Sequence, residues 1–140
     1  MISLRGAVTS GLGQGAYFVG LEWVRTIIQE LIGFDPYPGT LNLRLVDVET
    51  CLAWRGIRAG PALLLTPPPP EQCGARLIPV VVAPDIPAAV VVPDVTRYGD
   101  DMLEIVAAIH VRSRLGLQDD DRVTVRVYAP GGHDRAVSRW

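Results

Sequence analysis

A glycine-rich loop near the start of the 140-residue sequence is the first segment that could handle phosphate. It reads Gly11-Leu12-Gly13-Gln14-Gly15-Ala16, and its backbone amides can approach a phosphate or a base closely because glycine has no Cβ. A plain tight turn would use the same residues. The loop also fits a relaxed dinucleotide fingerprint, but Tyr17, Phe18 and Gly20 follow where such a loop should open into a helix. We therefore do not expect a dinucleotide-binding fold.

A threonine and an asparagine two residues apart form the second candidate. Thr40 and Asn42 lie at the start of the alternating segment Leu41–Leu45, which predicts a half-buried strand, so their side chains should share one face. A hydroxyl and a carboxamide oxygen in this arrangement can bind Mg²⁺, which takes its other ligands from water and phosphate. A hydrogen bond at the strand edge with a turn cap is the alternative that the spacing leaves open.

The third candidate is an acidic residue in an apolar run. Glu104 interrupts the apolar segment Met102–Ala108. A carboxylate among apolar neighbours needs a hydrogen-bonding or ionic partner, or else has a functional role. Such a group could accept a proton from a substrate hydroxyl. The alternative is that Glu104 lies on the solvated side of a strand. Nearby, His110, Arg112 and Arg114 could contact phosphate, although each taken singly is more typical of a surface charge.

The elements that position these residues are expected to be mostly strands. Ile2–Thr9 and Leu41–Leu45 have strand patterns, whereas Leu21–Ile32 has helical periodicity and ends before Gly33. Only this one main α-helix is convincing, apart from a short helical turn at Arg112–Leu115. The pattern favours a mostly β barrel over a layered α/β fold. Further short apolar runs, expected as strands, are Leu52–Trp54, Ala62–Leu65, Leu77–Ala83, Ala88–Val92, Met102–Ala108 and Val123–Tyr128.

Composition limits the classes of function. The 13 basic residues are all arginine, so neither a Schiff-base lysine nor a P-loop lysine is possible. A net charge of −2 does not indicate the excess positive charge that is typical of nucleic-acid binding. No segment is long and apolar enough to cross a membrane. We expect a cytoplasmic protein in which Cys51 and Cys73 are reduced. Asp119–Asp121 should form a solvated turn. One barrel domain is expected over residues 1–130, followed by a tail over residues 131–140.

Together these segments resemble the archaeal CTP-dependent riboflavin kinase family. The matching stretches are Ser10–Phe18, Gly33–Leu45 and Pro93–Arg112, and they occur in the order that the family has. The likeness runs from residue 6 to about residue 127 and is poor between Val46 and Val82. It implies a small six-stranded cradle-loop barrel, similar to the riboflavin synthase barrel, that makes FMN and CDP from riboflavin and CTP.

The resemblance also implies roles for individual residues. Gln14 stands where the family often has Glu, and His110 stands where it often has Lys. We expect a monomer, and the alternative to a kinase is a non-catalytic barrel that binds flavin or nucleotide as a sensor. The implied site residues are Gly11, Leu12, Gly13, Gln14, Gly15, Ala16, Ile109, His110, Val111 and Arg112 for the nucleotide, Thr40 and Asn42 for Mg²⁺, Thr96 and Glu104 for the flavin, and Glu104 as orienter or base.

Overall fold

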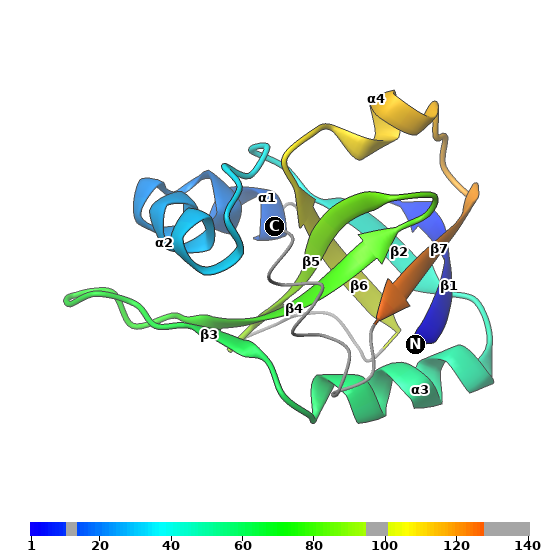
Figure 1. The fold of residues 1–140 in the computed structure, drawn as a ribbon, viewed down its shortest axis with the longest axis horizontal. Coiled ribbons are helices and arrows are strands. Elements are labelled where there is room, and N and C mark those ends of the chain that lie inside the picture. The colour runs from blue at the N-terminus through cyan, green and yellow to red at the C-terminus, as the bar shows by residue number, and fades with distance from the viewer. Residues whose placement is uncertain (11–13, 95–100, 128–140) are drawn as a thin grey trace.

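The computed structural model describes residues 1–10, 14–94 and 101–127. Its centre is one antiparallel sheet with the strand order β3-β4-β5-β6-β2-β1-β7 (Figure 1). The strands are β1 (Ile2–Thr9), β2 (Leu41–Leu45), β3 (Leu63–Leu65), β4 (Ala75–Val82), β5 (Ile86–Pro93), β6 (Met102–Ala107) and β7 (Arg122–Val127).

The sheet closes on itself. β4 pairs with β7 through Val81 opposite Arg126 and Val82 opposite Val125, which joins the second strand of the sheet to its last. Six strands therefore form a barrel, and β3 extends it as an outer strand on β4. Full closure leaves none of these six strands with an unpaired edge along its whole length. The predicted six-stranded, mostly β barrel is confirmed.

Alternation along each strand divides the apolar side chains between two cores. Inward-facing residues such as Leu43, Val80 and Leu103 fill the barrel. Outward-facing residues such as Leu77 and Val106 form a second core with the helices on that side of the barrel. Both cores are densely apolar, so a polar group buried in either of them requires an explanation.

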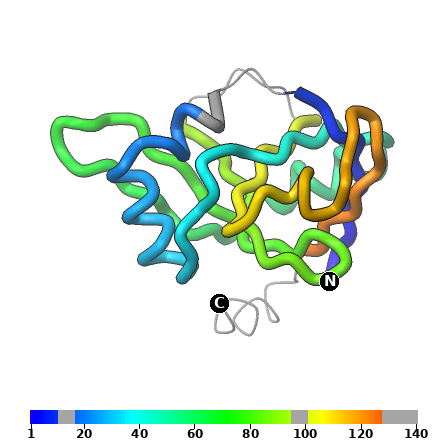
Figure 2. Tube along the Cα trace, turned by 90° about the horizontal axis from the view of Figure 1, so that it is seen from above, coloured from blue at the N-terminus to red at the C-terminus, as the bar shows by residue number. Residues whose placement is uncertain are grey.

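Four helices surround the barrel in the described part of the chain, and two of them contribute to the second core. α1 (Gln14–Gly20) and α2 (Glu22–Ile32) lie together beside the sheet, as both views show (Figures 1 and 2). Val24, Ile28 and Ile32 form the buried stripe of α2, which ends at Gly33 in the left-handed conformation with φ of 82°. The predicted helix and its glycine cap are confirmed.

The other two helices lie at opposite ends of the barrel (Figure 1). α3 (Val48–Arg58) contributes Trp54, which is only 2% exposed and packs in the barrel core. α4 (Val111–Leu115) contributes Val111 to the same core. The short helical turn predicted at Arg112–Leu115 is confirmed by α4.

Two expectations from the sequence are wrong. Leu52–Trp54, expected as a strand, lies in α3, which Asp47 caps by accepting a hydrogen bond of 2.7 Å from the backbone N–H of Thr50. The apolar residues of α3 do not form one buried stripe, since Val48 and Leu52 are exposed and the buried residues are Thr50 and Trp54. The glycine loop also precedes a helix directly, since α1 begins at Gln14. Among the described residues the strands nevertheless form only antiparallel pairs, so the exclusion of a dinucleotide fold stands.

Other expectations concern single groups. Cys51 and Cys73 are free thiols, as predicted. Asp119–Asp121 is a turn, also as predicted, in which Asp120 has a φ of 72° and its N–H donates to the carbonyl of Val8. No helix within residues 1–10, 14–94 and 101–127 has the length and hydropathy that crossing a bilayer requires. Gly11, Leu12, Gly13, Thr96 and the tail at residues 131–140 lie outside the described residues.

The close approach of β1 to β2 gives a test of the barrel. A Cβ on Gly6 would lie 2.8 Å from the Cβ of Leu43 and 3.3 Å from the carbonyl oxygen of Arg44. We expect Gly6→Ala to lower the free energy of unfolding by about 1–3 kcal/mol in urea titrations, because the strands must separate. Gly56→Ala is the matched control, since Gly56 is exposed in α3 with nothing within 4 Å, and it should stabilise by about 0.5–1 kcal/mol. Equal effects of the two substitutions would contradict the packing.

Candidate functional site

A row of three polar residues crosses three neighbouring strands on the outer face of the barrel. In the antiparallel register Asn42 of β2 lies opposite Thr9 of β1 on one side and opposite Glu104 of β6 on the other. The neighbours of these residues along each strand, among them Val8, Leu43 and Leu103, point into the barrel core. Alternation therefore places the three polar side chains together on the outside.

Thr40 joins this row immediately before β2 begins. Its hydroxyl donates a hydrogen bond of 3.3 Å to the carboxamide oxygen of Asn42. Both side chains are partly buried, so they are shielded without being closed off from a ligand. The expectation that these two side chains share one face is confirmed. The strand-edge hydrogen bond, which was the alternative to metal binding, is present, and metal binding stays a prediction.

Glu104 is the most unusual group of the row. It is 3% exposed, and neither carboxyl oxygen has a hydrogen-bond partner in the described part of the chain. Burial penalises the charged form and raises the pKa of Glu104 to about 7. The alternative that Glu104 lies on a solvated face is therefore wrong, because the outer face at this point is buried. Near neutral pH the carboxyl can either hold a proton or accept one.

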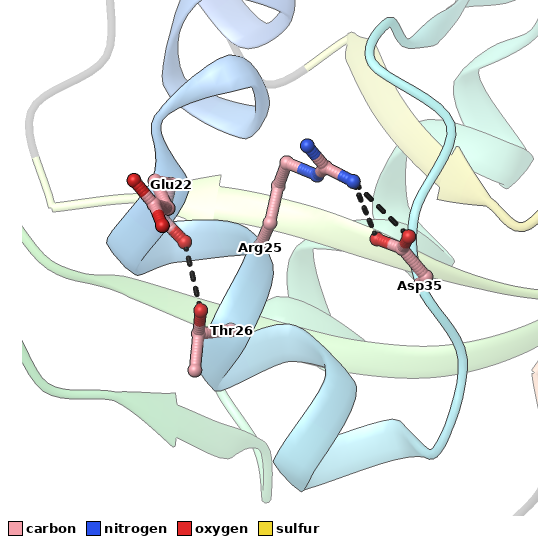
Figure 3. A network of polar contacts seen from close by, with 4 residues as sticks. All are labelled: Glu22, Arg25, Thr26 and Asp35. Carbon is pink, nitrogen blue, oxygen red and sulfur yellow. Dashed lines mark hydrogen bonds and ion pairs between the residues drawn. The ribbon is translucent and has the colours of Figure 1, made fainter.

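The loop before β2 is anchored at two points, one on α2 and one on β6. Arg25 of α2 contacts both carboxylate oxygens of Asp35 from one guanidinium nitrogen at 3.0 Å (Figure 3). On the same helix the hydroxyl of Thr26 donates to the carbonyl of Glu22 at 3.0 Å. At the barrel side the N–H of Tyr37 donates to the carbonyl of Ala107 at 2.8 Å. The loop that carries Thr40 is thus held between α2 and β6.

A pocket lies between this loop and the connection from β6 to α4. Tyr37 and Thr40 line one side, and the predicted nucleotide residues Ile109, His110, Val111 and Arg112 line the other. The rings of Tyr37 and His110 are stacked, with centroids 4.9 Å apart and planes at 27°. His110 Nδ1 lies 2.5 Å from the hydroxyl oxygen of Ser113, which fixes the orientation of the imidazole. We call this the Tyr37–His110 pocket.

The structure brings together only part of the predicted site. Thr40 and Asn42 lie beside Glu104, and Thr40 also shares the Tyr37–His110 pocket with Ile109–Arg112. Glu104 does not line that pocket. The backbone of Gln14, Gly15 and Ala16 forms the start of α1, and Gly11, Leu12, Gly13 and Thr96 lie outside the described residues, so their roles stay predictions.

Two residues at the site were not predicted. Thr9 could have been found only from the strand register, because nothing in the local sequence marks it. Tyr37 had a signal, since it lies between Pro36 and Pro38 in a rigid loop immediately before Thr40. An aromatic residue fixed in this way beside a metal-ligand candidate is a reasonable contact for a ligand.

The donor set tests whether Mg²⁺ fits. Thr40 and Asn42 offer two neutral oxygens 3.3 Å apart, and hard oxygen donors are those that Mg²⁺ prefers. Within the described ranges no group of three His, Cys, Asp or Glu side chains could hold a metal by itself. A cation held by Thr40 and Asn42 would therefore complete its shell with water and phosphate. The residues present fit a metal that is bound together with a nucleotide.

The class of protein follows from the fold and the site together. A closed antiparallel barrel carries the hydrogen-bonded Thr40–Asn42 pair and a buried acid on its outer face, next to a pocket with a histidine and an arginine. This is a small closed β-barrel with a candidate site on its outer face. The family model of the CTP-dependent riboflavin kinases, described as domain of unknown function DUF120, matches residues 8–127. The chain belongs to this family, so the predicted resemblance is confirmed.

Curated relatives agree with the family model. Riboflavin kinases from Pyrobaculum islandicum, Saccharolobus solfataricus and Halobacterium salinarum are 39%, 36% and 38% identical to the chain, and each alignment covers 91% of it. The alignments cover 61%, 74% and 58% of the respective relatives. The chain thus spans less than two thirds of the length of the Pyrobaculum and Halobacterium proteins.

The buried carboxyl predicts a pH dependence of stability. The pKa of Glu104 is raised from 4.5 to about 7, so the folded protein holds a proton that the unfolded chain releases between these values. Stability should therefore fall as the pH rises through this window, by about 2–3 kcal/mol, and should change no further above it. Glu104→Gln removes the titrating group, and its stability should lack this fall when urea unfolding is compared at about pH 4.5 and pH 8.

The control for this comparison is Glu30→Gln, because Glu30 is exposed on α2. It should keep the pH dependence of the wild type. If the difference between the wild type and Glu104→Gln were the same at both pH values, the carboxyl would not titrate in this window.

Proposed function

We propose that the chain is a riboflavin kinase, which transfers the γ-phosphate of CTP to the 5′-hydroxyl of the ribityl chain of riboflavin and gives FMN and CDP. Membership of the family supports this assignment. The observation that carries it is the position of Asn42, which lies between a metal-ligand partner, Thr40, and a buried carboxyl without a partner, Glu104. Phosphoryl transfer needs an anion-neutralising site and a hydroxyl acceptor held side by side.

Different residues of this chain would contact the nucleotide and the flavin. Thr40 and Asn42 would hold Mg²⁺, which supplies charge neutralisation for the phosphate oxygens when it is bound. The Tyr37–His110 pocket, with Arg112 on its wall, would hold the phosphate end of the nucleotide. Glu104, which lies directly opposite Asn42 on the neighbouring strand, would contact the flavin from the outer face of β6.

The chemical step is an in-line displacement at phosphorus. The ribityl oxygen forms a bond to the γ-phosphorus while the bond to the β,γ-bridging oxygen breaks, and CDP leaves with that electron pair. The proton of the hydroxyl passes to the carboxylate of Glu104. A carboxyl with a pKa of about 7 suits this role, since an appreciable fraction is ionised at neutral pH. A general base with a matched pKa contributes about 10²–10⁴-fold in rate.

The proposed activity is tested directly with riboflavin, Mg²⁺ and each of CTP, UTP, ATP and GTP. We expect FMN to form with CTP, by chromatography with fluorescence detection, and chelation of the metal to abolish it because the phosphate charge is then not neutralised. Riboflavin binding without FMN from any of the four nucleotides would instead identify a non-catalytic flavin-binding barrel.

Substitutions of Asn42 and of Glu104 should have separable effects. Asn42→Ala removes a metal-ligand oxygen and should raise the Mg²⁺ concentration needed for half-maximal activity by about tenfold or more. Glu104→Gln should lower kcat by about 100-fold at saturating Mg²⁺ without changing that concentration. Arg44→Ala is the control for both, because Arg44 is the next outward residue of β2 and is exposed. Full turnover by Glu104→Gln with normal riboflavin binding would contradict the role of Glu104.

A further inference from the structure

The two metal-ligand candidates are held by different parts of the fold. Asn42 is a residue of β2 and is paired on both sides, with Thr9 of β1 and with Glu104 of β6. Thr40 precedes β2 and takes part in neither ladder, since the pairs of β2 begin at Leu41. The barrel therefore fixes Asn42, whereas the position of Thr40 depends on the loop that leads to it.

This loop runs from Gly33, the cap of α2, to Thr40, and two prolines stiffen it. Pro36 and Pro38 have fixed φ angles, and each proline biases the residue before it to an extended conformation. A stiff loop transmits a displacement from one end to the other instead of absorbing it. The point at which the loop is attached to α2 therefore affects the position of Thr40.

The attachment is the ion pair of Arg25 with Asp35, the residue immediately before Pro36 (Figure 3). One guanidinium nitrogen lies 3.0 Å from each carboxylate oxygen. In the described part of the chain neither side chain has another hydrogen-bonding or ionic partner, and the Nε of Arg25 is buried without one. Asp35 is thus the group that compensates the charge of Arg25.

α2 is a firm support for this ion pair. Its buried stripe, formed by Val24, Ile28 and Ile32, packs in the second core. Arg25 directly follows Val24, and its backbone N–H donates to the carbonyl of Leu21 at 3.0 Å, so the packing of the helix fixes its backbone. The ion pair therefore connects the helical core to the loop before β2.

We propose, on the basis of the proposed function, that Arg25 and Asp35 are positioning residues for the metal. Their ion pair holds Thr40 where its hydroxyl can bind the metal together with the carboxamide oxygen of Asn42, 3.3 Å away. Neither residue touches the metal or a substrate, because each acts through the other and through the loop. Outer contacts of this kind keep a ligand oriented, and their loss weakens metal binding.

A second ion pair provides a matched control at the other end of β2. Arg5 of β1 binds Asp47, in the connection that leaves β2, at 3.2 Å. Both pairs join an element of the fold to a connection next to β2, and both are partly exposed. Only the Arg25–Asp35 pair lies on the side of Thr40. A general loss of stability would give the same effect in Arg5→Gln and Arg25→Gln, whereas positioning affects only the second.

The test measures metal binding without turnover. Mn²⁺, which takes the same oxygen ligands as Mg²⁺, is titrated in the presence of CDP and followed by electron paramagnetic resonance. Arg25→Gln and Asp35→Asn should each raise the Kd of Mn²⁺ by about threefold to fivefold, since an exposed ion pair contributes modestly. The double variant should show the same increase and no more, because the two side chains act as one unit. Arg5→Gln should match the wild type.

Two further measurements distinguish positioning from a structural role. In the metal-free protein the amide of Tyr37, which donates to the carbonyl of Ala107, should exchange with solvent about threefold to fivefold faster in Arg25→Gln than in Arg5→Gln. In turnover, Arg25→Gln should raise the Mg²⁺ concentration needed for half-maximal activity and leave kcat at saturating Mg²⁺ unchanged, because excess metal compensates for a displaced ligand.

The outcomes separate this proposal from the proposed function. FMN formation by the wild type with an unchanged Kd of Mn²⁺ in Arg25→Gln would overturn the positioning role and leave the kinase standing. The expected shifts in Kd without FMN from the wild type would overturn the kinase and support the positioning role. An equal increase in Arg5→Gln, or increases that multiply in the double variant, would overturn the positioning role, as would a wild type that binds no Mn²⁺ in the presence of CDP.

Discussion

The pairing of β4 with β7 closes the sheet, and this closure determines which side chains can meet a ligand. Inside a closed barrel of six strands the space is filled by apolar side chains such as Leu4, Leu43, Leu103 and Val125, and no substrate can enter it. Every polar residue of these strands must then lie on the outer face or at an end of the barrel. A shift of β6 by one residue against β2 would turn Glu104 inward and Leu103 outward. The apolar core thus fixes the register, and the register in turn fixes the site.

The outer face carries a group that the fold does not satisfy. Glu104 is buried beside the second core, and both its oxygens are unpartnered in the described part of the chain. Burying a carboxylate alone costs more than burying the neutral acid, and the raised pKa expresses this difference. A fold selected only for stability would place an apolar residue here. The group is better explained by a ligand that brings a hydrogen-bond donor, and riboflavin is such a ligand on the proposed function.

Local patterns in the sequence predicted those parts of the molecule that depend on local interactions. The alternation of Leu41–Leu45 predicted β2, and the Thr40–Asn42 spacing predicted their contact. α3 was missed because its signals were the Asp47 cap and a single buried Trp54 rather than an apolar stripe. The pairing of Asn42 with Glu104 could not be predicted from the sequence, since each strand alone permits many registers. The family resemblance supplied these residues together without the geometry that joins them.

The lack of lysine decides how the phosphate charge can be handled. On the proposed function the triphosphate lies near His110 and Arg112, the two basic side chains of the Tyr37–His110 pocket. Arg112 already pairs with Asp119, and His110 is stacked on Tyr37 and bound to Ser113, so neither is a free cation in the described chain. An ion pair at the surface offsets part of the positive charge that a phosphate would feel. On that function most of the neutralisation would come from a metal held by Thr40 and Asn42 and from backbone amides. The proposed function thus makes the Thr40–Asn42 pair, and not a basic side chain, the expected centre of the phosphate site.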